Sequence, residues 1–249
     1  MKQSKKILKY AAVTAFWLAV WQLAAVAVKQ EILIPSPAAT LSVLSRLCRD
    51  GSFWLSVLMS LLRIISGFLL GVAAGVAGAV ISSRFALFRA LTSPILRLVR
   101  AVPVASFIIL ALVWIKSGIL PVFICFLMVL PMVWDSVLTA IEDVDEKLLE
   151  MARVYRMTPY SILVHIKIPS VLPTFISTCM TALGFAWKSG VAAEVICRPA
   201  SSIGGMLQQA KVYLETPEVF ALTAVVAALS LLIEVIVRRA VRRFTYDKY

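Results

Sequence analysis

Residues 150–169 read EMARVYRMTPYSILVHIKIP and form the longest polar interruption in a strongly apolar sequence. Thr158 and Pro159 predict a helix start, because the threonine hydroxyl can cap free amides and proline has a pre-set φ. Apolar side chains at helical spacing predict a short amphipathic helix just before this point: Leu148, Leu149, Ala152 and Tyr155. The expected structure is helix, tight turn and helix at a membrane surface. A plain solvated loop between two membrane helices is the alternative.

The composition of the whole chain indicates a membrane protein. Of the 249 residues, 61% are hydrophobic and 15% are charged, and the mean hydropathy is +0.94. Soluble domains of this length are less apolar, and apolar runs of about 20 residues recur along the chain. The sequence therefore predicts an all-α, polytopic membrane protein with one transmembrane domain over residues 1–249. The net charge of +12 then reports topology and contact with the lipid bilayer rather than binding to nucleic acid.

Six transmembrane helices are expected, at about residues 10–28, 54–82, 104–114, 120–141, 171–196 and 217–237. The first could instead be a signal peptide, because Ala25-Val26-Ala27 resembles a cleavage site. We interpret it as a span, because its apolar run is long for a signal peptide. In the second span Gly67, Gly71 and Gly75 recur every four residues, which predicts close packing against another helix.

The distribution of Lys and Arg predicts the orientation of the chain. Six spans place both termini on one side, and that side collects 17 of these residues against 6 on the other. Positively charged loops remain in the cytoplasm, so the termini and residues 145–169 are predicted to be cytoplasmic.

No catalytic or metal-binding motif is present in the sequence. It contains no G-x-S-x-G, no H-E-x-x-H and no G-x-x-x-x-G-K-[ST], and His165 is its single histidine. The four cysteines have no C-x-x-C spacing, and a Cys48–Cys197 disulfide is an open possibility that we do not favour. No enzyme activity, metal or bound cofactor is therefore expected of this chain. If ATP is used, a partner chain must bind it.

Several polar or ionisable residues inside the apolar segments are candidates for a translocation pathway: Arg63, Asp135, Trp187, Lys188 and Glu194. Asp135 either lines a polar path or bonds to a neighbouring helix. Lys188 and Arg63 either favour an anion in the pore, or Lys188 and Glu194 pair with each other or lie at the outer interface. These groups also permit a stand-alone secondary transporter or channel, although that reading does not explain the amphipathic helix pair. A membrane-embedded enzyme is a third alternative, which lacks a nucleophile–base pair.

Several motifs give the chain a family resemblance. Glu150-Met151-Ala152-Arg153, with Ile168-Pro169 downstream, resembles the EAA loop of binding-protein-dependent ABC importer permeases. Four further segments are similar to the nitrate, sulfonate and taurine class of these permeases: Ile34-Pro35-Ser36-Pro37, SLLRIISGF at 60–68, Arg100-Ala101-Val102-Pro103 and AWKSGVAAE at 186–194. The resemblance extends over nearly the whole chain.

The resemblance implies a type I ABC importer permease in the bacterial inner membrane. Its expected partners are a second permease copy, ATP-binding cassette ATPase subunits that hold ATP and Mg²⁺, and an extracytoplasmic solute-binding protein near residues 36–52 and 198–215. The solute would be small, such as a sulfonate, nitrate, taurine or a vitamin precursor. Coupling helices at about 145–168 would contact the ATPase through Glu150, Met151, Ala152, Arg153, Tyr155, Arg156, Thr158 and Pro159.

Two residues depart from the EAA pattern. Met151 stands where the family has Ala, and Arg156 stands where it has Gly. Glycine tolerates a left-handed turn, whereas Arg in that geometry costs about 1 kcal/mol. The turn is therefore either reshaped in this chain, or Arg156 makes a contact specific to its own ATPase.

Overall fold

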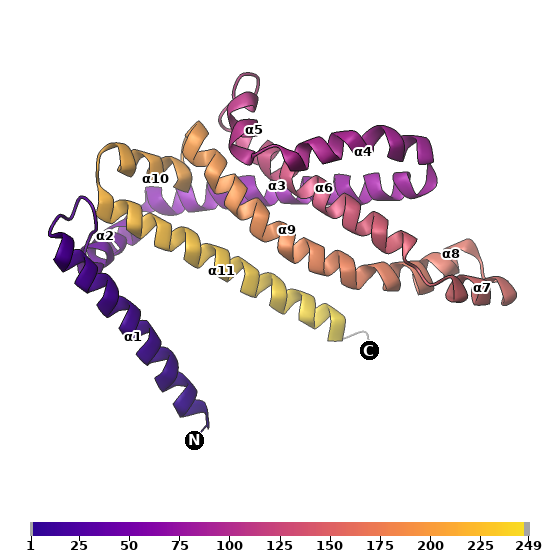
Figure 1. Ribbon diagram of the computed structural model, residues 1–249, viewed down its shortest axis with the longest axis horizontal. Coiled ribbons are helices and arrows are strands. Elements are labelled where there is room, and N and C mark those ends of the chain that lie inside the picture. The colour runs from indigo at the N-terminus through magenta and orange to yellow at the C-terminus, as the bar shows by residue number, and fades with distance from the viewer. Residues whose placement is uncertain (1, 247–249) are drawn as a thin grey trace.

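The computed structural model describes residues 2–246, with side chains described for residues 12–239, and this part of the chain is helical with no strand. The helices are α1 (Lys2–Val28), α2 (Pro37–Arg49), α3 (Gly51–Arg84), α4 (Ala86–Ala101), α5 (Val104–Ala111), α6 (Leu120–Glu142), α7 (Glu146–Val154), α8 (Pro159–Ile162), the π-helix η1 (Leu163–Lys167), α9 (Ile168–Cys197), α10 (Ile203–Val212) and α11 (Thr216–Tyr246). Figure 1 shows α2 and α10 at one end of the long axis and α7 and α8 at the other. We call these the α10 end and the loop end.

The centre of the molecule is the packing of α3 against α6, which run in the same direction. A Cβ atom added to Gly71 would lie 2.7 Å from Cβ of Val129, and one added to Gly75 would lie 2.9 Å from Cβ of Val133. Any side chain at these positions would push the helices apart. The predicted role of the glycine repeat in close helix packing is confirmed.

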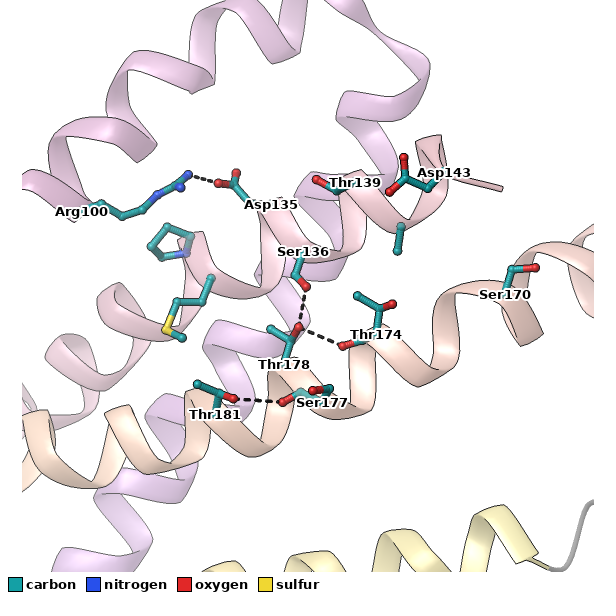
Figure 2. A pocket seen from close by; sticks show the side chains of 13 residues that line it. Arg100, Asp135, Ser136, Thr139, Asp143, Ser170, Thr174, Ser177, Thr178 and Thr181 are labelled. Carbon is teal, nitrogen blue, oxygen red and sulfur yellow. Dashed lines mark hydrogen bonds and ion pairs between the residues drawn. The ribbon is translucent and has the colours of Figure 1, made fainter. Parts of the chain in front are cut away.

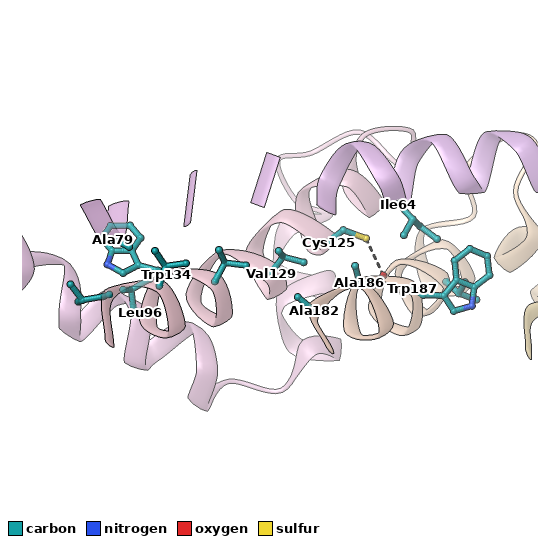
Figure 3. Close-up of a cluster of buried hydrophobic side chains, with 13 residues drawn as sticks. Ile64, Ala79, Leu96, Cys125, Val129, Trp134, Ala182, Ala186 and Trp187 are labelled. Atoms are coloured by element: carbon teal, nitrogen blue, oxygen red, sulfur yellow. Dashed lines mark hydrogen bonds between the residues drawn. The ribbon is translucent and has the colours of Figure 1, made fainter. Parts of the chain in front are cut away.

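Helix α9 completes this core from the other side. Figure 3 shows buried side chains of α3, α4, α6 and α9 that meet along α6, including Ile64, Leu96, Val129 and Trp187. The Trp187 indole Nε1–H donates to the carbonyl oxygen of Val226 at 3.1 Å, which attaches α11 to α9. Buried indole groups normally find such a partner, so this bond fixes the ring in place.

Helix α1 leaves the rest of the bundle, as Figure 1 shows. At its base, Trp21 donates from Nε1 to the carbonyl oxygen of Pro35 at 3.0 Å and stacks on Phe220 with ring centroids 5.8 Å apart. Elsewhere on α1 the side chains of Phe16 and Leu23 are exposed. An apolar helix with exposed side chains suits contact with lipid.

Four helical stretches are long and apolar enough to cross a membrane: α3, α6, the continuous stretch Pro159–Cys197, and Thr216–Arg239. The apolar helix Ala12–Val28 is shorter, and α4 with α5 forms a fifth candidate that is bent by 103°. The four long stretches contain four of the six expected spans, and the shorter helix Ala12–Val28 lies within a fifth, at residues 10–28.

The expected span at residues 104–114 differs from the structure. Helix α5 has 8 residues and rises only about 12 Å, against about 30 Å of hydrocarbon. Val102 and Pro103 are extended and break the helix between α4 and α5. A single straight helix over 104–114 is therefore wrong. Helix α5 reaches the length of a span only together with α4, across a bend of 103°.

Candidate functional site

The loop end is a helix–turn–helix, as the sequence predicts. Helix α7 begins at Asp145, whose Oδ1 accepts from the amide of Lys147 at 2.9 Å. Helix α8 begins at Thr158, whose hydroxyl accepts from the amide of Ser161 at 3.2 Å, with Pro159 in the first helical position. These caps satisfy amides that a helix start leaves free, which defines both helices in a short segment.

The turn between the two helices passes through Arg156, whose φ is 50°. The amide of Met157 donates to the carbonyl oxygen of Ala152 at 2.9 Å, and that of Arg156 donates to Arg153 at 3.0 Å. These two bonds form a Schellman motif, which places a left-handed residue after the helix end and normally uses glycine there. The turn is therefore not reshaped around Arg156, and an arginine occupies a strained position.

The side chains of the loop divide into a small core and an exposed surface. Ala152 is fully buried and packs with Val144 and Ile166. A larger side chain at position 152 would disrupt this core. Met151 lies on the exposed side, so its departure from the family alanine creates no clash. The exposed surface contains the other residues predicted for coupling: Glu150, Arg153, Tyr155, Arg156, Thr158 and Pro159.

The loop continues into α9 without a break. The π-helix η1 (Leu163–Lys167) joins α8 to α9, and the stretch Pro159–Cys197 is helical over 39 residues. π-Helical turns are rare and frequently occur at functional sites. A displacement of the loop would therefore move α9 directly.

A polar pocket of about 630 Å³ lies between α6 and α9, close to the end of α4. Figure 2 shows an ion pair between Arg100 and Asp135 on one wall and the hydrogen-bonded hydroxyls of Ser136 and Thr178 across it. The side chains of Arg100 and Asp135 are 44% and 42% exposed. This pair is accessible to water or solute from the pocket.

One face of α9 is polar and exposed along much of the helix. It carries Ser170, Thr174, Ser177, Thr181 and Lys188, spaced by three, four or seven residues so that they share one side. A charged side chain in a spanning helix is costly against lipid and normally faces protein or a water-filled cavity. The exposed face of α1 is apolar by contrast, so the two helices are built for different surroundings.

The α10 end contains a buried cluster that we call the Glu194 cluster, made of Ser60, Arg63, Glu194 and Gly204. The Glu194 carboxylate accepts from the Ser60 hydroxyl at 2.6 Å, from Arg63 Nη1 at 3.3 Å and from the Gly204 amide at 3.3 Å. Glu194 is fully buried, and the side chain of Arg63 is 12% exposed. A Cβ atom at Gly204 would lie 2.5 Å from Cβ of Glu194, so only glycine permits this approach.

The Glu194 cluster joins three elements. The carboxylate sits at the start of α10, where free amides and the helix dipole favour a negative charge. Arg63 also donates from Nη2 to the carbonyl oxygen of Ala200 at 2.8 Å and from Nη1 to that of Ser201 at 3.0 Å. Helices α3, α9 and α10 are therefore held by one network of charge-assisted hydrogen bonds.

Comparison with known proteins identifies the family. A family model for the inner membrane component of binding-protein-dependent transport systems matches residues 51–246, most of the chain. The chain belongs to this family. The permeases of this family are the membrane components of ABC transporters and are not themselves ATPases, as the sequence resemblance implied.

Curated relatives and solved structures agree with this assignment. A probable ABC transporter permease of Brucella melitensis is 28% identical over 86% of this chain and 87% of its own length. The taurine transport system permease TauC of Escherichia coli is 26% identical over 90% of this chain and 84% of its own. The structure is similar to that of a bacterial alginate ABC transporter, with a TM-score of 0.65 over 97% of this chain and 96% of the other and 15% identity. The fold is thus that of a type I ABC importer permease.

In this permease, the predicted pathway residues lie in three different environments. Asp135 pairs with Arg100 of α4, which is the bond to a neighbouring helix that the sequence raised, and it also lines the polar pocket. Lys188 is exposed and does not pair with Glu194, which bonds Arg63 instead. Trp187 is buried and donates to the carbonyl oxygen of Val226. A role of these five residues in a translocation pathway stays a prediction.

Sequence reasoning missed Arg100 and the hydroxyl face of α9. The recurrence of Ser and Thr at three- and four-residue spacing from Ser170 to Thr181 was the signal for that face. Cys48 and Cys197 are both free thiols, the first exposed and the second buried, so they form no disulfide.

Proposed function

We propose that this permease forms the translocation pathway of an ATP-driven importer together with a second copy, and that its loop end docks on ATPase subunits. ATP and Mg²⁺ would bind to those partner subunits. The observation that supports the proposal is the continuity of the exposed loop, η1 and the polar face of α9. One rigid element connects a surface suited to a soluble partner with a surface suited to a solute.

The exposed side chains of the loop favour docking in a groove of a partner protein. Val154, Tyr155 and Tyr160 are 80%, 75% and 74% exposed, with charged side chains beside them at Glu150 and Arg153. Apolar and aromatic anchors flanked by charges are typical of helix-in-groove contacts. The buried core around Ala152 keeps the loop together as one body, so closure of the ATPase would move α7 and α8 and carry α9 with them.

The polar pocket and the face of α9 favour a small, charged or strongly polar solute. The pocket offers a solute the charged groups of Arg100, Asp135 and Asp143, and the hydroxyl groups from Ser170 to Thr181 can replace water around a polar solute. The similarity to a taurine permease supports a sulfonate or taurine, with nitrate or a vitamin precursor as further candidates. A solute-binding protein would deliver the solute at the α10 end, and the loop end and both termini would lie in the cytoplasm.

The docking proposal is tested by substitutions on the exposed surface of the loop. Glu150→Lys and Tyr155→Ala leave the Ala152 core untouched, so we expect normal membrane insertion but loss of the co-purifying ATPase and of solute uptake. Tyr213→Ala is the matched control, because Tyr213 is 68% exposed at the opposite end of the molecule and should leave ATPase retention unchanged. Mass spectrometry of the chains retained after purification in mild detergent measures the effect.

Normal ATPase retention and uptake in both loop variants would contradict docking through this surface. If the chain instead purifies alone and transports solute in liposomes without ATP, the function is that of a stand-alone transporter.

A further inference from the structure

An apolar groove of about 260 Å³ lies at the loop end, separate from the polar pocket. It is formed by the last turns of α3 and α6 and by η1 with the start of α9, and its apolar lining includes Val80, Leu163, Val171 and Phe175. Val80 and Leu163 are 47% and 46% exposed, so the groove opens on the surface of the bundle. Its apolar lining is therefore accessible from outside the bundle.

Two cationic side chains also line this groove. Arg84 is the last residue of the spanning helix α3, and Lys167 is the last residue of η1, immediately before α9. Arg84 thus ends its spanning helix, and Lys167 lies about two turns into the long stretch Pro159–Cys197, on the same side of the molecule. Within the described residues neither makes an ion pair.

The carboxylates near the loop end of α6 do not neutralise these cations. Glu142 pairs with Arg89 and Asp135 pairs with Arg100. Asp143 lines the polar pocket and not the groove. The groove is thus apolar along its length and positive at one end.

We propose that this groove binds an anionic phospholipid, with an acyl chain along its apolar wall and the phosphate group between Arg84 and Lys167. The long apolar wall favours a ligand with an acyl chain over free phosphate, which would contact only the two cations and the Ser83 hydroxyl. A zwitterionic lipid can fill the groove but gains less from the cations, since its own amine offsets the phosphate charge. Basic pockets between transmembrane helices are suited to anionic head groups.

The position of the lipid gives it access to the joint between the loop and α9. The wide turn of η1 brings both Leu163 and Lys167 to the groove, while Arg84 belongs to α3. A bound lipid would bridge the two elements and stabilise the angle at which η1 enters α9. The site itself does not depend on ATPase docking or on the identity of the solute.

The test is native mass spectrometry of the full chain in mild detergent, titrated with phosphatidylglycerol or with phosphatidylcholine of the same acyl chains. We expect wild type to retain phosphatidylglycerol preferentially. Each cation near an anionic head group contributes about a fivefold preference, so the double variant Arg84→Gln/Lys167→Gln should lower it about 25-fold. The control Arg97→Gln/Arg239→Gln removes two charges outside the groove and should keep the preference.

A second variant tests the apolar part of the site without changing its charge. Val80→Trp places a large side chain in the groove and should reduce retention of both lipids. Equal retention of the two lipids by wild type would overturn the proposal, as would an unchanged preference in the Arg84→Gln/Lys167→Gln variant. Loss of the preference in the control variant would show a diffuse charge effect and would also overturn it.

Discussion

Two regions of the molecule, the α10 end and the polar pocket between α6 and α9, arrange charge in opposite ways. At the α10 end, Glu194 is buried, the Arg63 side chain is only 12% exposed, and every oxygen of the carboxylate has a donor. In the polar pocket, Arg100 and Asp135 form an ion pair in which almost half of each side chain is exposed. The first arrangement holds elements together, and the second leaves charge accessible.

This difference indicates where the molecule is rigid and where it can move. A buried charge must keep all its partners, because an unpaired charge in low dielectric is costly. Half-exposed ion pairs contribute little to stability, and each side chain can exchange its partner for water or solute. The α10 end is therefore suited to a fixed surface, and the polar pocket to changes of contact during a transport cycle.

The largest effect is expected from Glu194→Ala. This change leaves Arg63 and the amide of Gly204 without their buried acceptor, and breaking such a pair costs about 3–5 kcal/mol. The free energy of unfolding, measured in detergent from the denaturant dependence of tryptophan fluorescence, should fall by this amount. The comparison of the two regions fails if the loss is below about 1 kcal/mol.

The double variant Arg63→Met/Glu194→Met provides the matched control. It removes both charges together and fills their space with apolar atoms. Such a replacement of a buried ion pair often leaves the free energy of unfolding nearly unchanged. If the double variant loses less unfolding free energy than Glu194→Ala, the loss in Glu194→Ala comes from the unpaired charge of Arg63. A larger loss would attribute it to the hydrogen bonds that Arg63 makes with Ala200 and Ser201.

The sequence predicted local structure well, because the signals for it are local. Thr158 and Pro159 mark a helix start wherever they occur in this arrangement, and the glycine repeat of α3 requires a close neighbour. The pairing of Arg63 with Glu194 joins residues 131 positions apart, and no spacing rule predicts it. The break between α4 and α5 follows the local signal of Pro103, whereas no local signal gives the 103° angle there, and the hydropathy of residues 104–114 did not indicate it.

An effect of intermediate size is expected at Arg156, where the loop end stores backbone strain. Replacing this left-handed arginine by glycine should stabilise the turn by about 1 kcal/mol. Hydrogen exchange of the loop amides should slow about fivefold, provided that exchange occurs through local opening. Arg153→Gly, three positions earlier inside α7, is the control and should destabilise the helix by about the same amount.

Solute uptake by the Arg156→Gly variant then tests whether the Arg156 side chain also contacts the ATPase, apart from the backbone strain that it causes. If Arg156 binds an acidic surface on the ATPase, uptake falls although the turn is more stable. Uptake at the wild-type level would show that the arginine has no such contact. Faster hydrogen exchange would contradict the assignment of strain to this residue.

The smallest effect on stability is expected at the open pair of the polar pocket. Asp135→Asn removes one charge but keeps the shape of the side chain, and pairs this exposed contribute about 0–1 kcal/mol. We therefore expect a change of at most about 1 kcal/mol in the free energy of unfolding, together with a clear fall in solute uptake measured in proteoliposomes. Arg100→Gln should behave in the same way, because its guanidinium faces the same pocket. A loss of several kcal/mol from either change would mean that the pair is structural, and the polar pocket would then use charge for the same purpose as the α10 end.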